Sequence, residues 1–437
     1  MIAIKNNFKT GSIILATAIM LLTACNKDVE QIGATPVVPA ISSLRALGDT
    51  LSKSTNDSLF YKVLARAGKL TLLNDKSRSF TIFSPDNNAI RTFITAATGG
   101  LIPAGSPEAA YVGFINGVLR TGQADTLVMY HIIPQAVPAA NIPTSFPNFP
   151  YPTLFNPASA LSPFARLDAY ISRRTNGAWK NNIPVIAPDM LAANGVIHRI
   201  AAVSVPPSQL LLQRVAADTG LTFLYAAVQR ADSGATATST SSLQYFLGNQ
   251  GIALGANFTL FAPTNQAFKN ALYVRAFPIV RGLLYQGAYA QAIAGGATPA
   301  MADAIATAYA DANAPDSTRA RVSSPAVFQN PALFPFLTAQ SVKGILFYHL
   351  LSVRTFSVNL PSTATSVFTL LNSAVPSHPG LSVQATFTGP FVSAATVKGV
   401  INPTAANLII NPFPGGSSDQ HYVNGVLHKI DQVLFPQ

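Results

Sequence analysis

Three short sequence motifs occur twice in this chain of 437 residues, in the same order both times. They read FTIFSPDNNAI (80–90) and FTLFAPTNQAF (258–268), then LVMYHII (127–133) and ILFYHLL (345–351), then NGVIHRI (194–200) and NGVLHKI (424–430). Ordered repeats of this kind indicate a tandem duplication. The chain is therefore constrained to fold as two related domains.

The boundary between the two copies is marked by prolines. Pro206 and Pro207 come shortly after the last motif of the first copy. Proline cannot extend a strand ladder or enter a helix interior, and a new helical pattern begins at Leu210. We therefore predict one domain over residues 40–205 and a second over residues 206–437.

Composition predicts well-packed domains and argues against nucleic acid as a partner. Hydrophobic residues make up 49% of the chain and charged residues 10%, which is enough apolar material to bury two cores. The formal net charge of +11 is dispersed, and the one dense basic pair, Arg173 and Arg174, has no interleaved aromatic residues. Nucleic-acid binding needs clustered cations along the phosphates, so no nucleic-acid partner is expected.

The first motif predicts a strand that ends in a capped helix. Thr264 is a natural N-cap because its hydroxyl can accept from backbone donors two or three residues on, and Asp86 can do the same in the first copy. Asn87 and Asn265 complete this strand-turn-helix motif, and a short helix is expected to follow each one. We interpret the motif as structural and not as a ligand site.

The third motif predicts a hairpin. Asn194–Gly195 and Asn424–Gly425 suit a type I′ turn, in which both central residues have positive φ. A strand should follow each turn.

In those following strands, His198 and His428 share a face with β-branched residues. This alternation predicts buried, neutral, hydrogen-bonded imidazoles, because a buried polar group must find a partner. The opposite face carries Arg199 and Lys429, and these charges predict that it is the outer face.

The second motif places a tyrosine and a histidine at the end of an apolar helical run. These are Tyr130 and His131 in the first copy, and Tyr348 and His349 in the second. Histidine is a common metal ligand and acid-base group, but no Cys, Asp or Glu stands at ligand spacing beside either one. The residues alone leave a structural and a functional role both open, and predict no metal site.

No motif of a known catalytic chemistry occurs in the chain. A Gly-x-Ser-x-Gly elbow, a His-Glu-x-x-His helix and a glycine-rich phosphate loop are all missing from the sequence. The remaining histidines, His378 and His421, lie in polar surroundings and are predicted to be exposed. We expect a non-enzymatic protein without a cofactor, with an extracellular hydrolase as the weaker alternative.

The three motifs together resemble the fasciclin-domain family, and the resemblance covers both copies. It implies an α+β fold of two tandem fasciclin-like domains, each with a β-sandwich or wedge core and helices packed along one edge. In that family the Tyr-His segment has been proposed as adhesive. The resemblance therefore makes Tyr130, His131, Tyr348 and His349 a candidate adhesive surface.

The N-terminal segment resembles that of a bacterial lipoprotein. Lys5 and Lys9 precede an apolar run over 13–22, and the residues that follow lead to Cys25, the only cysteine of the chain. The sequence Leu-Thr-Ala-Cys at 22–25 is similar to a lipobox, which implies a signal peptide over 1–24, lipid attachment at Cys25 and a tether over 25–39. An ordinary signal peptide is the alternative. Charged residues after the cysteine resemble the surface-export signals of Bacteroidetes lipoproteins.

These features combine into one functional hypothesis. We expect a lipoprotein of the outer membrane that faces the cell surface, is held to the membrane by its N-terminal lipid, and binds extracellular protein or polysaccharide in adhesion. Two linked sites could add avidity. The alternatives are a structural envelope protein and an accessory component of an outer-membrane glycan-uptake system. A glycan site would favour the proline-rich loop around Phe146, Phe149 and Tyr151, whereas Trp179 is expected to pack in the core.

Overall fold

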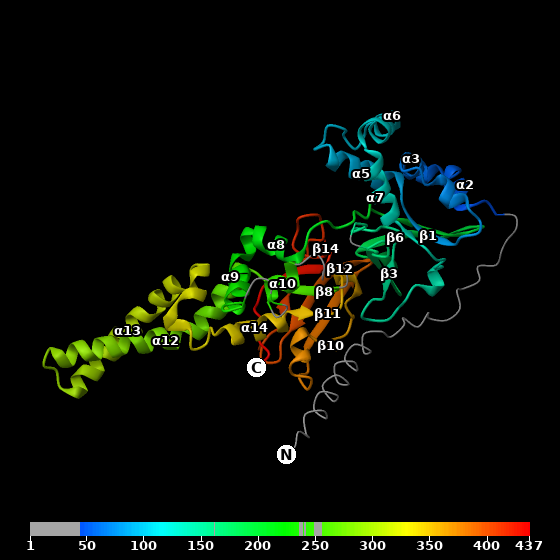
Figure 1. The fold of residues 1–437 in the computed structure, drawn as a ribbon. Coiled ribbons are helices and arrows are strands. Elements are labelled where there is room, and N and C mark those ends of the chain that lie inside the picture. The colour runs from blue at the N-terminus through cyan, green and yellow to red at the C-terminus, as the bar shows by residue number, and fades with distance from the viewer. Residues whose placement is uncertain (1–43, 161, 236–238, 240–241, 249–255) are drawn as a thin grey trace, which may run out of the picture.

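The computed structural model describes residues 44–160, 162–235, 239, 242–248 and 256–437. The predicted signal peptide, Cys25 and the tether lie outside these residues. Figure 1 shows two α+β units side by side, the first in blue to cyan and the second in green to red. Val205, Pro206 and Pro207 lie outside helix and strand, between the last strand of the first unit and the first helix of the second.

The first domain is built on one seven-stranded sheet with the strand order β2-β1-β7-β6-β5-β4-β3. Its strands are β1 (Phe80–Pro85), β2 (Ile132–Ile133), β3 (Pro150–Pro152), β4 (Asp168–Arg174), β5 (Gly177–Lys180), β6 (Ile183–Ala192) and β7 (Gly195–Ile200). Its helices are α2 (Leu47–Ser52), α3 (Ser58–Arg66), α4 (Leu70–Asn74), α5 (Asn87–Ala97), α6 (Glu108–Gly113) and α7 (Thr121–Tyr130), with short turns η1 (Thr55–Asp57), η2 (Phe114–Val118) and η3 (Ala139–Asn141).

The side chains of β1 alternate between two cores in this domain. Phe80 and Ile82 join the helices in one cluster, whereas Phe83 lies in a second cluster with Ala169 and Ile171 of β4. Strands β1 and β4 are far apart in the strand order, so the sheet must curl for them to share a core. The result is a sandwich with the helices on one side.

The second domain contains two four-stranded sheets, β10-β11-β12-β13 and β14-β15-β8-β9. Its strands are β8 (Phe258–Pro263), β9 (Leu350–Leu351), β10 (Thr365–Val367), β11 (Leu381–Thr388), β12 (Phe391–Lys398), β13 (Ala406–Asn407), β14 (Gln420–Tyr422) and β15 (Gly425–Ile430). Its helices are α8 (Leu211–Ala217), α9 (Thr222–Ala231), α10 (Leu243–Gly248), α12 (Asn265–Ala294), α13 (Pro299–Arg321) and α14 (Ala339–Tyr348), with short turns η4 (Thr219–Leu221), η5 (Pro325–Gln329), η6 (Pro331–Leu333), η7 (Ser357–Asn359) and η8 (Leu370–Ser373).

The two domains repeat one strand arrangement. Strand β1 pairs in parallel with β7 from Phe80 opposite Gly195, and β8 pairs in parallel with β15 from Phe258 opposite Gly425. Each first strand also pairs antiparallel with the two residues after the Tyr-His motif. The predicted α+β fold of two related domains is therefore confirmed.

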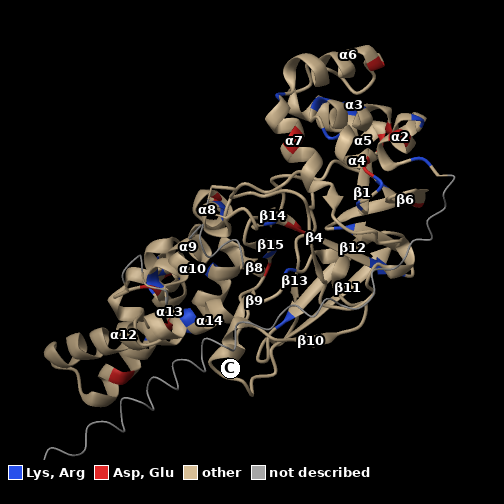
Figure 2. Cartoon of the chain, turned by 45° about the vertical axis from the view of Figure 1, so that its right-hand side comes forward, with Lys and Arg blue, Asp and Glu red and all other residues tan. Residues whose placement is uncertain are grey.

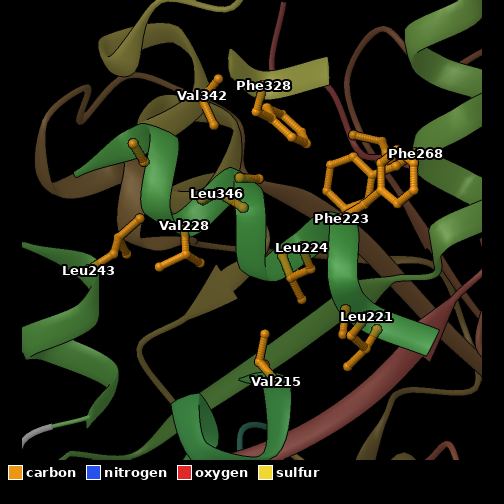
Figure 3. Packing of buried hydrophobic residues seen from close by; sticks show 14 of the residues in the cluster. Val215, Leu221, Phe223, Leu224, Val228, Leu243, Phe268, Phe328, Val342 and Leu346 are labelled. Carbon is orange, nitrogen blue, oxygen red and sulfur yellow. The ribbon is translucent and has the colours of Figure 1, made fainter. Parts of the chain in front are cut away.

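The largest core lies between the helices and one sheet of the second domain. Phe223 of α9 stacks on Phe268 of α12 with 6.3 Å between ring centroids, and Phe328 meets Phe268 edge-on at 5.9 Å. Figure 3 shows these three rings together, with Leu224 and Leu346 beside them. Aromatic pairs at such spacings stabilise a core by more than the burial of their apolar area alone.

A long helical arm distinguishes the second domain from the first. The helix after Thr264 was predicted to be short, but α12 runs for 30 residues and packs against α13. Alanine favours helix, and the Ala-rich residues 287–314 lie in α12 and α13 except for the turn between the two helices. Buried alanines recur every four residues on α13, at Ala302, Ala306, Ala310 and Ala314, and such small side chains let the two helices approach closely. In Figure 1 the arm points away from the rest of the protein.

The predicted hairpins are present, but their turns are not of type I′. Ala192 pairs with Gly195, so the loop residues are Ala193 and Asn194, and Asn194 does not have positive φ. Gly195 is needed for another reason. Its φ is 150°, and a Cβ atom there would lie 1.9 Å from the carbonyl oxygen of Phe80 on the neighbouring strand.

We predict that Gly195→Ala destabilises the protein by more than about 3 kcal/mol, because the methyl group meets the backbone of β1 and the backbone leaves its favoured region. Gly99→Ala is a matched control, since Gly99 also has positive φ but no atom lies within 4 Å of the added Cβ. It should cost about 1–2 kcal/mol. Urea unfolding of both variants measures the difference, and equal losses would refute the close-approach explanation.

Candidate functional site

The residues of the first motif hold the start of a helix in both domains. Asp86 Oδ1 accepts from the backbone N–H of Ala89 at 2.7 Å, and Thr264 Oγ1 accepts from Ala267 at 3.2 Å, so both are the N-caps that the sequence predicts. Both cap side chains bond the backbone, which supports the structural interpretation of the motif.

The asparagine after each cap makes the same contacts in both domains. Asn87 Oδ1 accepts from Leu59 N at 2.9 Å, and its amide donates to the carbonyl of Thr55 at 2.8 Å. Asn265 Oδ1 accepts from Phe223 N at 3.1 Å and its amide donates to another main-chain carbonyl at 2.8 Å. Each asparagine thereby links the start of the helix after the strand, α5 or α12, to the helix before the strand, α3 or α9.

The asparagine of the third motif caps two helices at once. Asn194 Oδ1 accepts from the backbone N–H of Leu47 at the start of α2, and its amide donates to the carbonyl of Leu73 at the end of α4. Asn424 bonds Leu211 at the start of α8 and Leu247 at the end of α10 in the same way. Helix ends carry unpaired backbone groups, so this one side chain satisfies both termini.

The histidines of the Tyr-His motif are held as neutral imidazoles. His131 Nδ1 lies 2.7 Å from the carbonyl of Leu127, and its Nε2 accepts from Ser204 N at 3.0 Å. His349 Nδ1 lies 2.8 Å from the carbonyl of Ile345, and its Nε2 accepts from a backbone N–H at 2.9 Å. Because a backbone N–H can only donate, Nε2 is unprotonated in both rings.

Burial opposes protonation of these two rings. It lowers the pKa of His131 to about 3, with a smaller contribution from the charge of Lys180, and lowers the pKa of His349 to about 4. Neither ring nitrogen is left for a substrate or a metal. The two residues are therefore part of the framework.

The histidines of the third motif are buried as predicted. His198 Nε2 lies 2.8 Å from the carbonyl of Val137, and its Nδ1 accepts from Asp189 N at 3.2 Å. His428 repeats this with the carbonyl of Thr355 at 2.9 Å and a backbone N–H at 3.2 Å. Burial lowers the pKa of His198.

The predicted adhesive surface does not exist as a surface. The side chains of Tyr130, His131, Tyr348 and His349 are 0% exposed. The Tyr348 hydroxyl donates to a carbonyl at 2.7 Å and accepts from a backbone N–H at 3.0 Å, and the Tyr130 hydroxyl accepts from Asn181. The prediction is wrong because the end of an apolar helix turns into the sheet, which carries both side chains inward.

The charged face of the third-motif strand was also predicted wrongly. Arg199 is only 17% exposed in its side chain and forms an ion pair at 2.7 Å with Asp57, which is fully buried. Lys429 contacts Asp218 at 2.6 Å in the same way. Charge here marks a buried ion pair and not an outer face, because helices of each domain supply the acid.

His378 and His421 are partly buried and not exposed as predicted. His378 Nδ1 accepts from Gly380 N at 3.0 Å. His421 Nε2 accepts from the Arg354 guanidinium at 2.6 Å. Burial, followed by the charges of Arg354 and Lys180, holds the pKa of His421 well below its usual value.

The two domains meet through a shared apolar cluster. Tyr170 and Trp179 of the first domain pack with Phe356, Val358 and Val426 of the second. Trp179 is fully buried, so the predicted role in a core is correct, and the core is the one between the domains.

Polar contacts surround this cluster. The Asn359 amide donates to the Ser172 hydroxyl at 2.7 Å, and the Asn176 amide donates to the carbonyl of Gly389 at 2.6 Å. Arg174 donates to the carbonyl of Asn359. The interface therefore combines an apolar cluster with hydrogen bonds between the domains, of which the bond from Asn359 to Ser172 is itself buried.

Two cations that sequence reasoning missed are buried near the junction. Lys180 Nζ donates to the Ser204 hydroxyl at 2.5 Å and lies 4.0 Å from the centre of the Tyr130 ring. Burial holds its pKa well below the usual value. Arg354 bonds backbone carbonyls of the second domain and lies 5.2 Å from the centre of the Tyr170 ring. No local sequence signal identifies Lys180, because it follows the buried Trp179 in β5 and successive side chains of a strand point to opposite faces.

Two of the three aromatic rings named in the proline-rich loop pack against hydrophobic cores. Phe146 packs against a core cluster of the second domain, and Tyr151 packs against a core of the first. Phe149 is the one ring of the three with substantial exposure, at 46%. The loop is therefore a contact between domains and does not form the aromatic platform expected for a glycan.

The described residues contain neither a cluster of metal-binding side chains nor a membrane-spanning helix. Within the residues that the structure describes, no group of three or more His, Cys, Asp or Glu side chains could hold a metal ion. No helix in that part of the chain is both long and apolar enough to span a bilayer.

One segment of the chain, within the first domain, matches a known protein family. Residues 56–206 match the family model described as "Fasciclin domain". No curated protein matches the chain. Among solved structures, the chain is similar to a FAS1 domain pair from the insect cell adhesion molecule Fasciclin I, at 17% identity over 86% of this chain and 95% of that one. The TM-score is 0.30, which is too low for that likeness to bear on fold or function.

We predict that stability falls as the pH drops from about 6.5 to about 4, because the unfolded state takes up protons that buried His131 and His349 do not. Each histidine contributes a loss of about 1.4 kcal/mol per pH unit in this window and nothing above it. Urea unfolding across this pH range tests this in the wild type and in His349→Asn. The variant should lose stability less steeply, and equal slopes would contradict the prediction.

Proposed function

We propose that this protein is a lipid-anchored surface protein that binds extracellular protein or polysaccharide in adhesion, and that it is not an enzyme. The observation that carries the proposal is the match of residues 56–206 to the fasciclin domain, together with the repetition of the same framework in the second domain. Fasciclin domains are associated with cell adhesion.

The use of the motif side chains supports a binding role. The caps, asparagines and histidines of both copies bond the backbone of their own domain, so the motifs hold the fold and leave specificity to the outer surface. The buried junction supports a fixed spacing between the two outer surfaces. Two sites held at a fixed spacing could bind one long partner with avidity.

Anchoring at the outer membrane is part of the proposal. It rests on the lipobox-like residues before Cys25, which would carry lipid, and on the polar segment after it. Two or three acyl chains give stable attachment, whereas one chain gives only reversible binding.

Replacing Cys25 with Ser should release the protein from the membrane, because the thiol that would carry the diacylglycerol is lost. We would fractionate source cells and detect the second domain with an antibody. Protease added to intact cells should digest the wild type if the protein faces outward. Membrane association of Cys25→Ser that still requires detergent to release would refute the anchor. Protection of the wild type in intact cells would favour a periplasmic envelope role.

Binding itself is tested with the purified full-length Cys25→Ser chain on immobilised collagen, fibronectin, polygalacturonate and dextran. We expect saturable binding to at least one of them, with dissociation constants in the micromolar range, about −8 kcal/mol. An absence of saturable binding to all four would refute adhesion to these ligand classes. In that case, loss of envelope integrity in a deletion strain would support the structural alternative.

A further inference from the structure

An open groove lies where the arm of the second domain joins the body of that domain. It has a volume of about 510 Å³ and lies between the first turns of α12 and the end of α13. Ligand sites in proteins commonly have volumes of about 300–1,000 Å³. Six of the groove residues can form hydrogen bonds: Gln266, Lys269, Asn270, Tyr273, Arg319 and Ser323. The first domain has no counterpart of this arm among its described helices.

The charges at the groove are positive. Lys269 and Arg319 line it, and no acidic side chain does. Lys269 forms no ion pair with another described residue. Arg319 bonds Asp316 at 2.7 Å, but both side chains are mostly exposed, and an exposed pair of this kind adds little stability. A guanidinium has five N–H donors, so Arg319 keeps others for an anion. Figure 2 shows basic positions at this base of the arm.

Amide groups and one ring stand beside these cations. The Gln266 amide donates to Asn270 Oδ1 at 2.8 Å, which leaves the Gln266 carbonyl oxygen and the Asn270 amide N–H groups for other partners. Tyr273 is partly exposed, with Arg319 5.8 Å from its ring centre. An aromatic ring offers an apolar surface to the C–H groups of a sugar, and its hydroxyl offers a hydrogen bond.

This set of groups favours a saccharide over a protein partner. Protein interfaces are centred on buried apolar and aromatic anchors and bury about 800 Å² per partner. The groove has one well-exposed apolar side chain, Val274. Amides, a ring and two cations suit a ligand that carries many hydroxyls and a carboxylate, which Arg can bind through two parallel hydrogen bonds.

We propose that this groove binds acidic polysaccharide, with Lys269 and Arg319 on the anionic groups and Tyr273 against a sugar ring. The inference rests on the proposed function and names a site and a ligand class for it. Carboxylate and sulfate groups share this chemistry, so the test must separate them.

The first experiment compares Lys269→Ala/Arg319→Ala with the wild type in the full-length Cys25→Ser chain. Binding to polygalacturonate should weaken on the order of tenfold, since two exposed ion pairs are lost. The control is Lys76→Ala/Arg78→Ala, which removes the same charge from the first domain. Arg78 also pairs with an Asp three residues before it, as Arg319 does. The control should bind polygalacturonate like the wild type. If both double variants lose affinity equally, net charge alone explains the loss and the proposed site is wrong.

The second experiment tests whether the groove recognises a sugar ring or only negative charge. Tyr273→Ala should weaken binding to polygalacturonate but leave weak binding to poly-L-glutamate unchanged. Tyr273→Phe keeps the ring and loses only the hydroxyl, so its affinity for polygalacturonate should lie between those of Tyr273→Ala and the wild type. Dextran sulfate in place of polygalacturonate shows whether sulfate is preferred, and neutral dextran should not bind. Thermal melts confirm that each variant is folded.

Three further outcomes would overturn the inference. Poly-L-glutamate that binds as tightly as polygalacturonate would assign the groove to acidic protein segments. If the wild type binds collagen or fibronectin but neither acidic polysaccharide, the groove proposal is refuted and the proposed adhesive function is not. Binding to none of these ligands would remove both.

Discussion

The parallel pairing of the first-motif strand with the third-motif strand is the contact on which each domain depends. It joins residues far apart in the chain, Phe80 with Gly195 and Phe258 with Gly425. The backbones approach so closely that a side chain on Gly195 has no room. This pairing places Asn194 where it can cap two helices and directs the helix after Asp86 onto the sheet. The native sheet and its helices therefore depend on one another through these contacts.

The junction adds a second constraint, because it buries large apolar side chains of both domains in one cluster. Trp179 and Phe356 bury their rings against each other's domains, and Lys180 and Arg354 lie beside Tyr130 and Tyr170 with burial that disfavours charge on the lysine. Separation of the domains would expose the rings and rehydrate these groups. An interface with an apolar centre of this kind holds two domains in one relative position.

The sequence predicted what local chemistry decides. The duplication, the caps Asp86 and Thr264, and the burial of His198 follow from period, spacing and the need to satisfy buried polar groups. Other features depend on partners that no local pattern shows. Arg199 is drawn inward by Asp57, which lies 142 residues away in sequence, and the hairpin turn is set by the approach of β1. The burial of Tyr130 and the groove beside α13 follow in the same way from tertiary packing.

The distribution of side chains between framework and surface bears on where binding can occur. Some side chains have every polar atom hydrogen-bonded to the backbone of their own domain. Such a side chain cannot change partner without leaving a buried polar group unpaired, which costs about 1–3 kcal/mol. His131 and Asn424 are of this kind, so the repeated motifs are poorly suited to recognition. The arm formed by α12 and α13 is free of that restriction, because its outer side chains contribute little to the core. Specificity is therefore expected where the two copies differ, and not where they agree.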